Sequence, residues 1–132
     1  MSNTEIILKM YEAFVKRDAL AIMERIDEKI IITQTEQLPW GGEFHGPEGL
    51  QTFFGKLLST VNSNVEAQEF IEADNRVAVI GRTHGTVIAN GNPFDIKIVH
   101  VWTLENGKAT RFEPYVDTPG MLRALNAETR TQ

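Results

Sequence analysis

His100 is the side chain of this 132-residue protein whose position most strongly indicates chemistry. It lies in the run PFDIKIVHVWTL, whose alternation of residue types predicts a strand. Because side chains alternate between the faces of a strand, His100 shares an otherwise apolar face with Ile98 and Trp102. The imidazole is then either a core histidine bonded to a backbone carbonyl or neighbouring side chain, or a titratable group in a ligand cavity. Both alternatives require a partner, since a buried, unpaired polar group costs about 1–3 kcal/mol.

Carboxylates on the following strand are candidate partners for this imidazole. The ENG run at 105–107 predicts a hairpin turn, and pairing of residues equidistant from it brings Glu113 opposite His100. Asp117 lies about two pairs further out, unless Pro114 marks a bulge. A carboxylate–imidazole pair is a recurrent general-base unit. The alternatives are that Glu113 lies on a solvated face and that Asp117 caps the strand end.

The loop EQLPWGGEFHGPEGLQTFF carries aromatic residues where most loops are polar. Trp40 and Phe44 either form apolar walls at the mouth of a cavity, or Trp40 fills the top of the core.

The sequence carries no motif for metal binding or for nucleophilic catalysis. The three histidines show no H-x-x-E-H or H-x-H spacing, GxSxG is absent, and there are no cysteines. We therefore expect neither a metal nor a cofactor.

The charge and hydropathy of the chain argue against nucleic acid and membrane partners. The formal net charge of −5 disfavours binding to nucleic acid. No apolar run approaches the roughly 20 residues that span a bilayer, and the N-terminus lacks the pattern of a signal peptide. We expect one domain over residues 1–132, in the cytoplasm and without membrane contact.

The remaining patterns predict the elements that position these residues. Helical periodicity covers residues 6–15 and 19–26, and a third helix follows Gly46 with Pro47 at its first position. Strands are predicted at 29–36, 64–74, 76–90, 93–105 and 108–117, with primed hairpin turns at NGN and ENG. A closing helix over 118–128 is predicted to have Thr118 as its cap. This order predicts an α+β domain with helices on one face of an antiparallel sheet.

The whole pattern resembles the SnoaL-like branch of the nuclear-transport-factor-2-like, or ketosteroid-isomerase-like, superfamily. The resemblance lies in MYEAFVKRDALAIM, FHGPEGLQTFF and HVWTLENGKATRFEPYVDTPGMLRAL and spans nearly all of the chain. It implies a cone, in which a strongly bent antiparallel sheet wraps a long N-terminal helix, with two or three further helices and an apolar cavity. Members include steroid isomerases, polyketide cyclases, epoxide hydrolases, dehydratases and binding modules, so the fold does not fix the function.

The resemblance also implies roles for single residues. It puts Gln37 at the base position of the isomerases, where Gln cannot accept a proton, and Tyr11 near the phenol that stabilises an enolate. His100 takes the place of a second, protonated Asp, and Asp117 matches an acid/base Asp of the polyketide cyclases. We therefore take His100 and Asp117 as the candidate catalytic residues. The candidate substrate-binding residues are Tyr11, Phe14, Trp40, Phe54, Trp102 and Tyr115.

Two functions from different classes follow from these assignments. The first is a cofactor-independent isomerase, cyclase or hydrolase that acts by acid/base chemistry on an apolar, carbonyl-bearing molecule. The second is a non-catalytic binder of a hydrophobic small molecule, or a dimerisation module. The resemblance also implies a homodimer through the sheet, whose outer face carries Val99, Val101 and Thr103 and is therefore rather apolar.

Overall fold

The structure is a computed structural model that describes residues 1–126. This part of the chain forms four helices and six strands. In chain order they are α1 (Asn3–Val15), α2 (Ala19–Met23), β1 (Ile26–Gln34), β2 (Gly42–His45), α3 (Gly46–Thr60), β3 (Val61–Ala73), β4 (Arg76–Val87), β5 (Pro93–Glu105), β6 (Lys108–Val116) and α4 (Thr118–Leu125).

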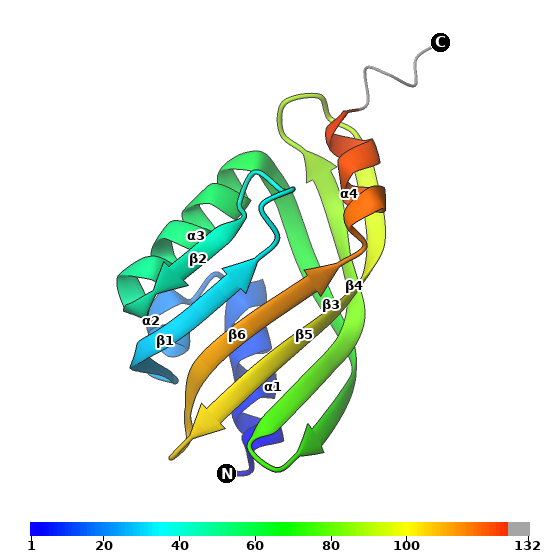
Figure 1. Ribbon diagram of the computed structural model, residues 1–132. Helices are drawn as coiled ribbons and strands as arrows, with labels where there is room; N and C mark the ends of the chain where they lie inside the picture. The colour runs from blue at the N-terminus through cyan, green and yellow to red at the C-terminus, as the bar shows by residue number, and fades with distance from the viewer. Residues whose placement is uncertain (127–132) are drawn as a thin grey trace.

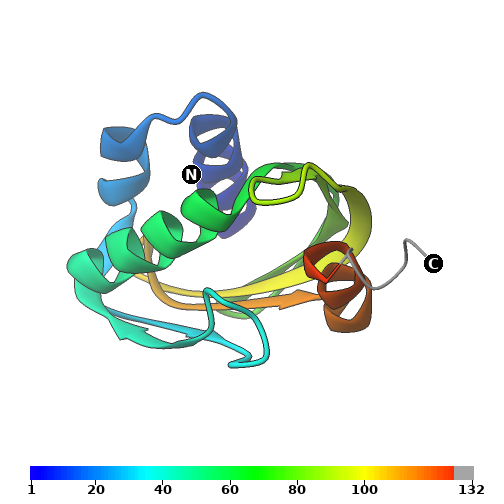
Figure 2. The same ribbon diagram turned by 90° about the horizontal axis from the view of Figure 1, so that it is seen from above.

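All six strands form one sheet in the order β2-β1-β6-β5-β4-β3 (Figure 1). Neighbouring strands are antiparallel except β1 and β6, which run parallel. Helices α1, α2 and α3 lie on one side of the curved sheet, and α4 lies beside its end (Figure 2). The predicted fold class, an α+β cone with a bent sheet around the N-terminal helix, is confirmed. The strand β2 and the parallel pairing of β1 with β6 were not predicted.

Glycines and bulges produce the curvature of the sheet. The register of β3 and β4 shifts between Ala67 and Glu69, opposite Gly81. At Gly81 a Cβ atom would lie 2.1 Å from the carbonyl oxygen of Glu66, so only glycine permits this approach of the two strands. Gly85 has a φ of 156° and faces β3 equally closely.

Local signals account for the ends of the helices. Ser2 and Glu5 form the capping box of α1, and the side chain of Asp18 caps α2. The cap of α4 is Asp117 and not Thr118, because the Asp117 carboxylate accepts from the backbone N–H of Gly120 at 3.0 Å. Any continuation of the closing helix past residue 126 lies outside the described residues.

Of the two predicted hairpin turns, the one at ENG has the predicted backbone conformation and the one at NGN is longer than predicted. Asn106 and Gly107 both have positive φ, at 52° and 78°, as a primed turn requires. The connection at NGN is longer than predicted, because β4 ends at Val87 and β5 begins at Pro93. None of the helices within residues 1–126 is long and apolar enough to cross a bilayer.

Candidate functional site

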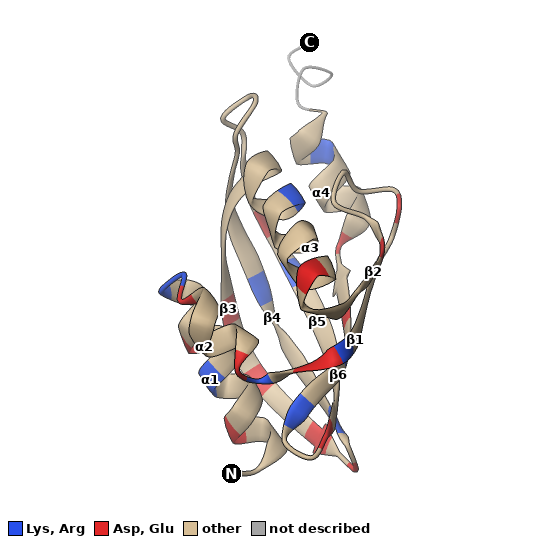
Figure 3. Ribbon diagram, turned by 90° about the vertical axis from the view of Figure 1, so that its left-hand side faces the viewer, with Lys and Arg blue, Asp and Glu red and all other residues tan. Residues whose placement is uncertain are grey.

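A cavity lies between the sheet and the helices α1 and α3. The centre of a water molecule can move through about 70 Å³ of it, several times the space that one water needs. The residues that line it are Met10, Tyr11, Phe14, Ile22, Gln34, Trp40, Phe53, Phe54, Leu57, Val61, Ser63, Val65, Thr83, Ile98, His100, Trp102, Phe112, Pro114, Val116 and Met121. None of these is Asp, Glu, Lys or Arg. Figure 3 shows that Lys, Arg, Asp and Glu are spread over both the helices and the strands of the fold.

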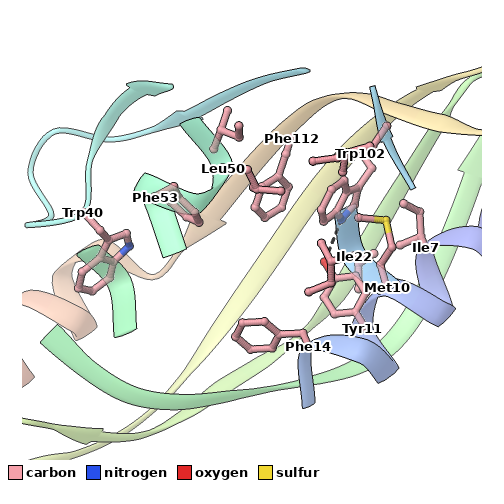
Figure 4. Packing of buried hydrophobic residues seen from close by; sticks show 14 of the residues in the cluster. Ile7, Met10, Tyr11, Phe14, Ile22, Trp40, Leu50, Phe53, Trp102 and Phe112 are labelled. Atoms are coloured by element: carbon pink, nitrogen blue, oxygen red, sulfur yellow. Dashed lines mark hydrogen bonds between the residues drawn. The ribbon is translucent and has the colours of Figure 1, made fainter. Parts of the chain in front are cut away.

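Three side chains form a hydrogen-bonded chain beside this cavity. The indole Nε1–H of Trp102 donates to the hydroxyl oxygen of Tyr11 at 2.9 Å, as the dashed line in Figure 4 shows. The same hydroxyl lies 2.5 Å from Nδ1 of His100. The indole N–H can only donate, and the Tyr11 hydroxyl has no other hydrogen-bond acceptor among residues 1–126, so we assign the Tyr11 hydrogen to the bond with Nδ1, which accepts it. The neutral imidazole therefore carries its own hydrogen on Nε2.

The Nε2–H group of His100 reaches the cavity. Over residues 1–126, no buried side-chain nitrogen or oxygen lacks a hydrogen-bond partner. The only hydrogen bond of the His100 ring in that range is the one at Nδ1. Nε2 is therefore not enclosed by protein atoms, although His100 as a whole is 8% exposed. The imidazole thus presents an uncharged donor to a largely apolar space.

Burial controls the charge of this group. Desolvation lowers the pKa of His100 to about 3, and desolvation also raises the pKa of Tyr11 well above its ordinary value. Both side chains are neutral at pH 7. A ring with so low a pKa is a weak proton acceptor, but it remains a hydrogen-bond donor.

The predicted carboxylate partners of His100 lie elsewhere, and a bulge explains the error for Glu113. The register of β5 and β6 shifts next to the hairpin, so that Thr110 is unpaired and Thr103 pairs with Arg111. His100 consequently pairs with Pro114, and Glu113 is turned to the outer face of the sheet. The predicted bulge at Pro114 is in fact at Thr110.

Asp117 and Tyr115 are not among the residues that line the cavity. Asp117 is exposed and caps α4, which is the structural alternative that the sequence left open. Tyr115 is 55% exposed, and its hydroxyl donates to Glu113 at 3.2 Å. The predictions that Asp117 orients the imidazole and that Tyr115 lines the cavity are therefore wrong.

The other six candidates surround the cavity: Tyr11, Phe14, Trp40, Phe54, His100 and Trp102. The rings of Phe14 and Phe54 lie 5.5 Å apart and form one wall. Trp40 lines the cavity and is also 1% exposed, so its two proposed roles, wall and plug, coincide. Phe44 instead packs on Phe53 from outside the lining, at a ring distance of 5.8 Å.

Sequence analysis missed the polar residues Gln34, Ser63 and Thr83 of the lining. Gln34 lies on the same face of β1 as the buried residues Ile30 and Ile32. The alternation of β1 therefore predicts that the Gln34 side chain points into the core. Gln37, the position assigned to the isomerase base, is exposed and outside the lining. Among residues 1–126 there is no group of three or more His, Cys, Asp or Glu side chains able to hold a metal ion.

Comparisons with known proteins agree with this architecture. An NTF2-like protein of unknown function from Burkholderia pseudomallei is 31% identical, with a TM-score of 0.89 over 96% of this chain and 99% of that one. TerC, co-crystallised with polyporic acid, is 29% identical, with a TM-score of 0.86 over 93% and 97% of the two chains. A putative polyketide cyclase from Pseudomonas putida shares the fold at 19% identity, with a TM-score of 0.82 over 94% and 98%.

No curated protein shows significant sequence similarity to the chain. The model of the SnoaL-like domain matches residues 7–112, which hold five of the six strands in full and nearly all of the cavity lining. With the NTF2-like relatives and the cone around an apolar cavity, this match shows that the chain belongs to the SnoaL-like family.

Proposed function

We propose that the protein binds an apolar, uncharged small molecule that carries a hydrogen-bond acceptor such as a carbonyl oxygen. The observation that carries this proposal is the Nε2–H of His100, a donor open to a cavity without charged side chains. A few polar groups in an apolar pocket orient a ligand. An ionised ligand would be desolvated there without a counter-charge, which is strongly unfavourable.

Matched probes test this proposal. We expect wild-type protein to bind 2-acetylnaphthalene up to about tenfold more tightly than 2-ethylnaphthalene, because one net hydrogen bond contributes about 0.5–1.5 kcal/mol and tenfold corresponds to about 1.4 kcal/mol. Titration calorimetry measures both affinities. His100→Leu should remove the preference, whereas Met10→Leu, another change in the lining, should retain it. Equal affinities in wild type, or a preference that survives His100→Leu, would contradict the proposal.

Catalysis is a second candidate function, favoured by the Trp102–Tyr11–His100 chain. A neutral imidazole N–H held in place by such a chain can stabilise an oxyanion or enolate as it forms, with solvent taking the α-proton because the cavity lining carries no carboxylate or lysine. This is the electrophilic role in a cofactor-independent isomerase or cyclase, and it differs from the general base inferred from the sequence. Deuterium exchange at the methyl group of bound 2-acetylnaphthalene, followed by NMR, tests it. Exchange no faster than in buffer would favour the non-catalytic binder.

A homodimer through the outer face of the sheet remains part of the proposal. Val99 is 39% exposed and Tyr115 55% exposed on this face, and their strands pair at these positions. Apolar side chains exposed at the middle of a sheet favour association with a second copy. We expect sedimentation at tens of micromolar to give a dimer for wild type and a monomer for Val99→Glu. A wild-type monomer would contradict this.

A further inference from the structure

The cavity meets a groove at the edge between β1 and β6. Three residues, Gln34, Pro114 and Val116, line both spaces. The rest of the groove is formed by hydroxyl-bearing side chains, which are Thr33, Thr35, Tyr115 and Thr118. The apolar cavity and the polar groove thus share these three residues as a common wall.

The sheet opens at this point because the ladder between β1 and β6 stops. Their last pair is Ile32 with Phe112, and Gln34 is paired only on the other side of β1, with Gly42 of β2. The next residue of β6 on that face, Pro114, has no N–H to donate to a ladder. We define the junction of Gln34, Pro114 and Val116 as the seam.

Gln34 is the polar group of the seam. It is 7% exposed, and its Oε1 accepts from the backbone N–H of Thr35 at 3.1 Å. Its amide nitrogen has no hydrogen bond to any residue in the range 1–126, yet no enclosed polar atom in that range lacks a partner. The NH₂ group is therefore open to the cavity or the groove, and it needs an acceptor there.

The strand pairing gives the approximate distance between Gln34 and His100. Pro114 pairs with His100 across β5 and β6, and Gln34 lies on the strand on the other side of Pro114. Two inter-strand spacings, about 10 Å, are a lower limit for the separation of the Gln34 and His100 backbones, because β1 and β6 are no longer paired at Gln34. Two uncharged donors therefore face the same lining at a separation comparable to the length of a two-ring molecule.

We propose that the seam is a second ligand subsite, where the Gln34 amide donates to an oxygen at the far end of the molecule whose first oxygen accepts from His100. This inference rests on the proposed function and narrows the ligand class. The ligand is elongated and uncharged, apolar in its middle, and carries an oxygen at each end. Its distal end reaches the hydroxyl groups of the groove.

The test compares 2-acetylnaphthalene with 6-hydroxy-2-acetylnaphthalene, which adds a distal hydroxyl. Wild type should bind the hydroxyketone about tenfold more tightly. In Gln34→Leu the two affinities should become equal, while the affinity for 2-acetylnaphthalene changes less than threefold. Gln37→Leu, an equivalent change in the exposed loop, should keep the tenfold preference.

The possible failures are distinguishable. If wild type prefers 2-acetylnaphthalene over 2-ethylnaphthalene but shows no gain from the distal hydroxyl, or if Gln34→Leu keeps that gain, the subsite is overturned and the proposed function stands. If wild type does not prefer the ketone over the hydrocarbon, both fail. Should Gln34→Leu not fold, a crystal structure of wild type with the hydroxyketone decides. A distal oxygen within 3.5 Å of the Gln34 amide nitrogen supports the subsite, and an oxygen elsewhere overturns it.

Discussion

Replacing Trp40 with alanine is expected to lower the free energy of unfolding by about 3–5 kcal/mol, the range for deleting a large buried aromatic side chain. Trp40 is 1% exposed, although it lies in a loop between β1 and β2. The loop holds it in place through backbone hydrogen bonds from Leu38 to Thr35 and from Gly41 to Leu38. Removing the indole would leave a void that extends the existing cavity. Urea denaturation measures the effect.

A matched substitution in an exposed position provides the control. Leu20 is 79% exposed in α2, so Leu20→Ala should change the unfolding free energy by less than about 0.5 kcal/mol. If Trp40→Ala also costs less than about 1 kcal/mol, the indole does not close the cavity and the assigned packing of the loop is wrong.

Acid is expected to destabilise the wild type more than a variant without the buried imidazole. The pKa of His100 is about 3 in the folded state and about 6.5 when unfolded, so between these values only the unfolded state binds the proton. The free energy of unfolding therefore falls as the pH drops below about 6.5, with a slope of up to about 1.4 kcal/mol per pH unit. From pH 6.5 to 4.5 this amounts to about 2 kcal/mol.

The difference in unfolding free energy between wild type and His100→Gln isolates the contribution of the imidazole. His100→Gln keeps an acceptor for the Tyr11 hydroxyl and does not titrate, whereas all other ionisable groups are common to both proteins. Urea denaturation of both at pH 4.5, 5.5, 6.5 and 7.5 should show curves that converge or cross toward low pH and run parallel above 6.5. Parallel behaviour over the whole range would mean that the imidazole is not desolvated.

The elements of the fold were predictable because their signals are local. The periodicity of α1, the capping residues Ser2 and Asp18, and the turn at Asn106 and Gly107 each depend on a few adjacent residues. The six cavity-lining candidates follow from the alternation of strands and from the resemblance to the SnoaL-like family. The parallel pairing of β1 with β6 was not predictable in this way, since it joins segments about 80 residues apart.

The partner of His100 shows where such local prediction fails. A single unpaired residue, Thr110, moves every later residue of β6 by one position and turns Glu113 away from the cavity. No residue type marks Thr110 as the site of a bulge, whereas Pro114 looked like one. The actual partner, Tyr11, comes from a helix 89 positions earlier, and only the packing of α1 on the sheet brings it to Nδ1.

The central claim is that His100 is a neutral imidazole with its hydrogen on Nε2, available to a ligand in an apolar cavity. Nitrogen-15 NMR of the histidine ring measures protonation and tautomer together. We expect a neutral ring with a protonated Nε2 and an accepting Nδ1 from pH 7.5 down to 4.5. A cationic ring with a midpoint near the ordinary value of about 6.5, or a neutral ring with its hydrogen on Nδ1, would contradict it.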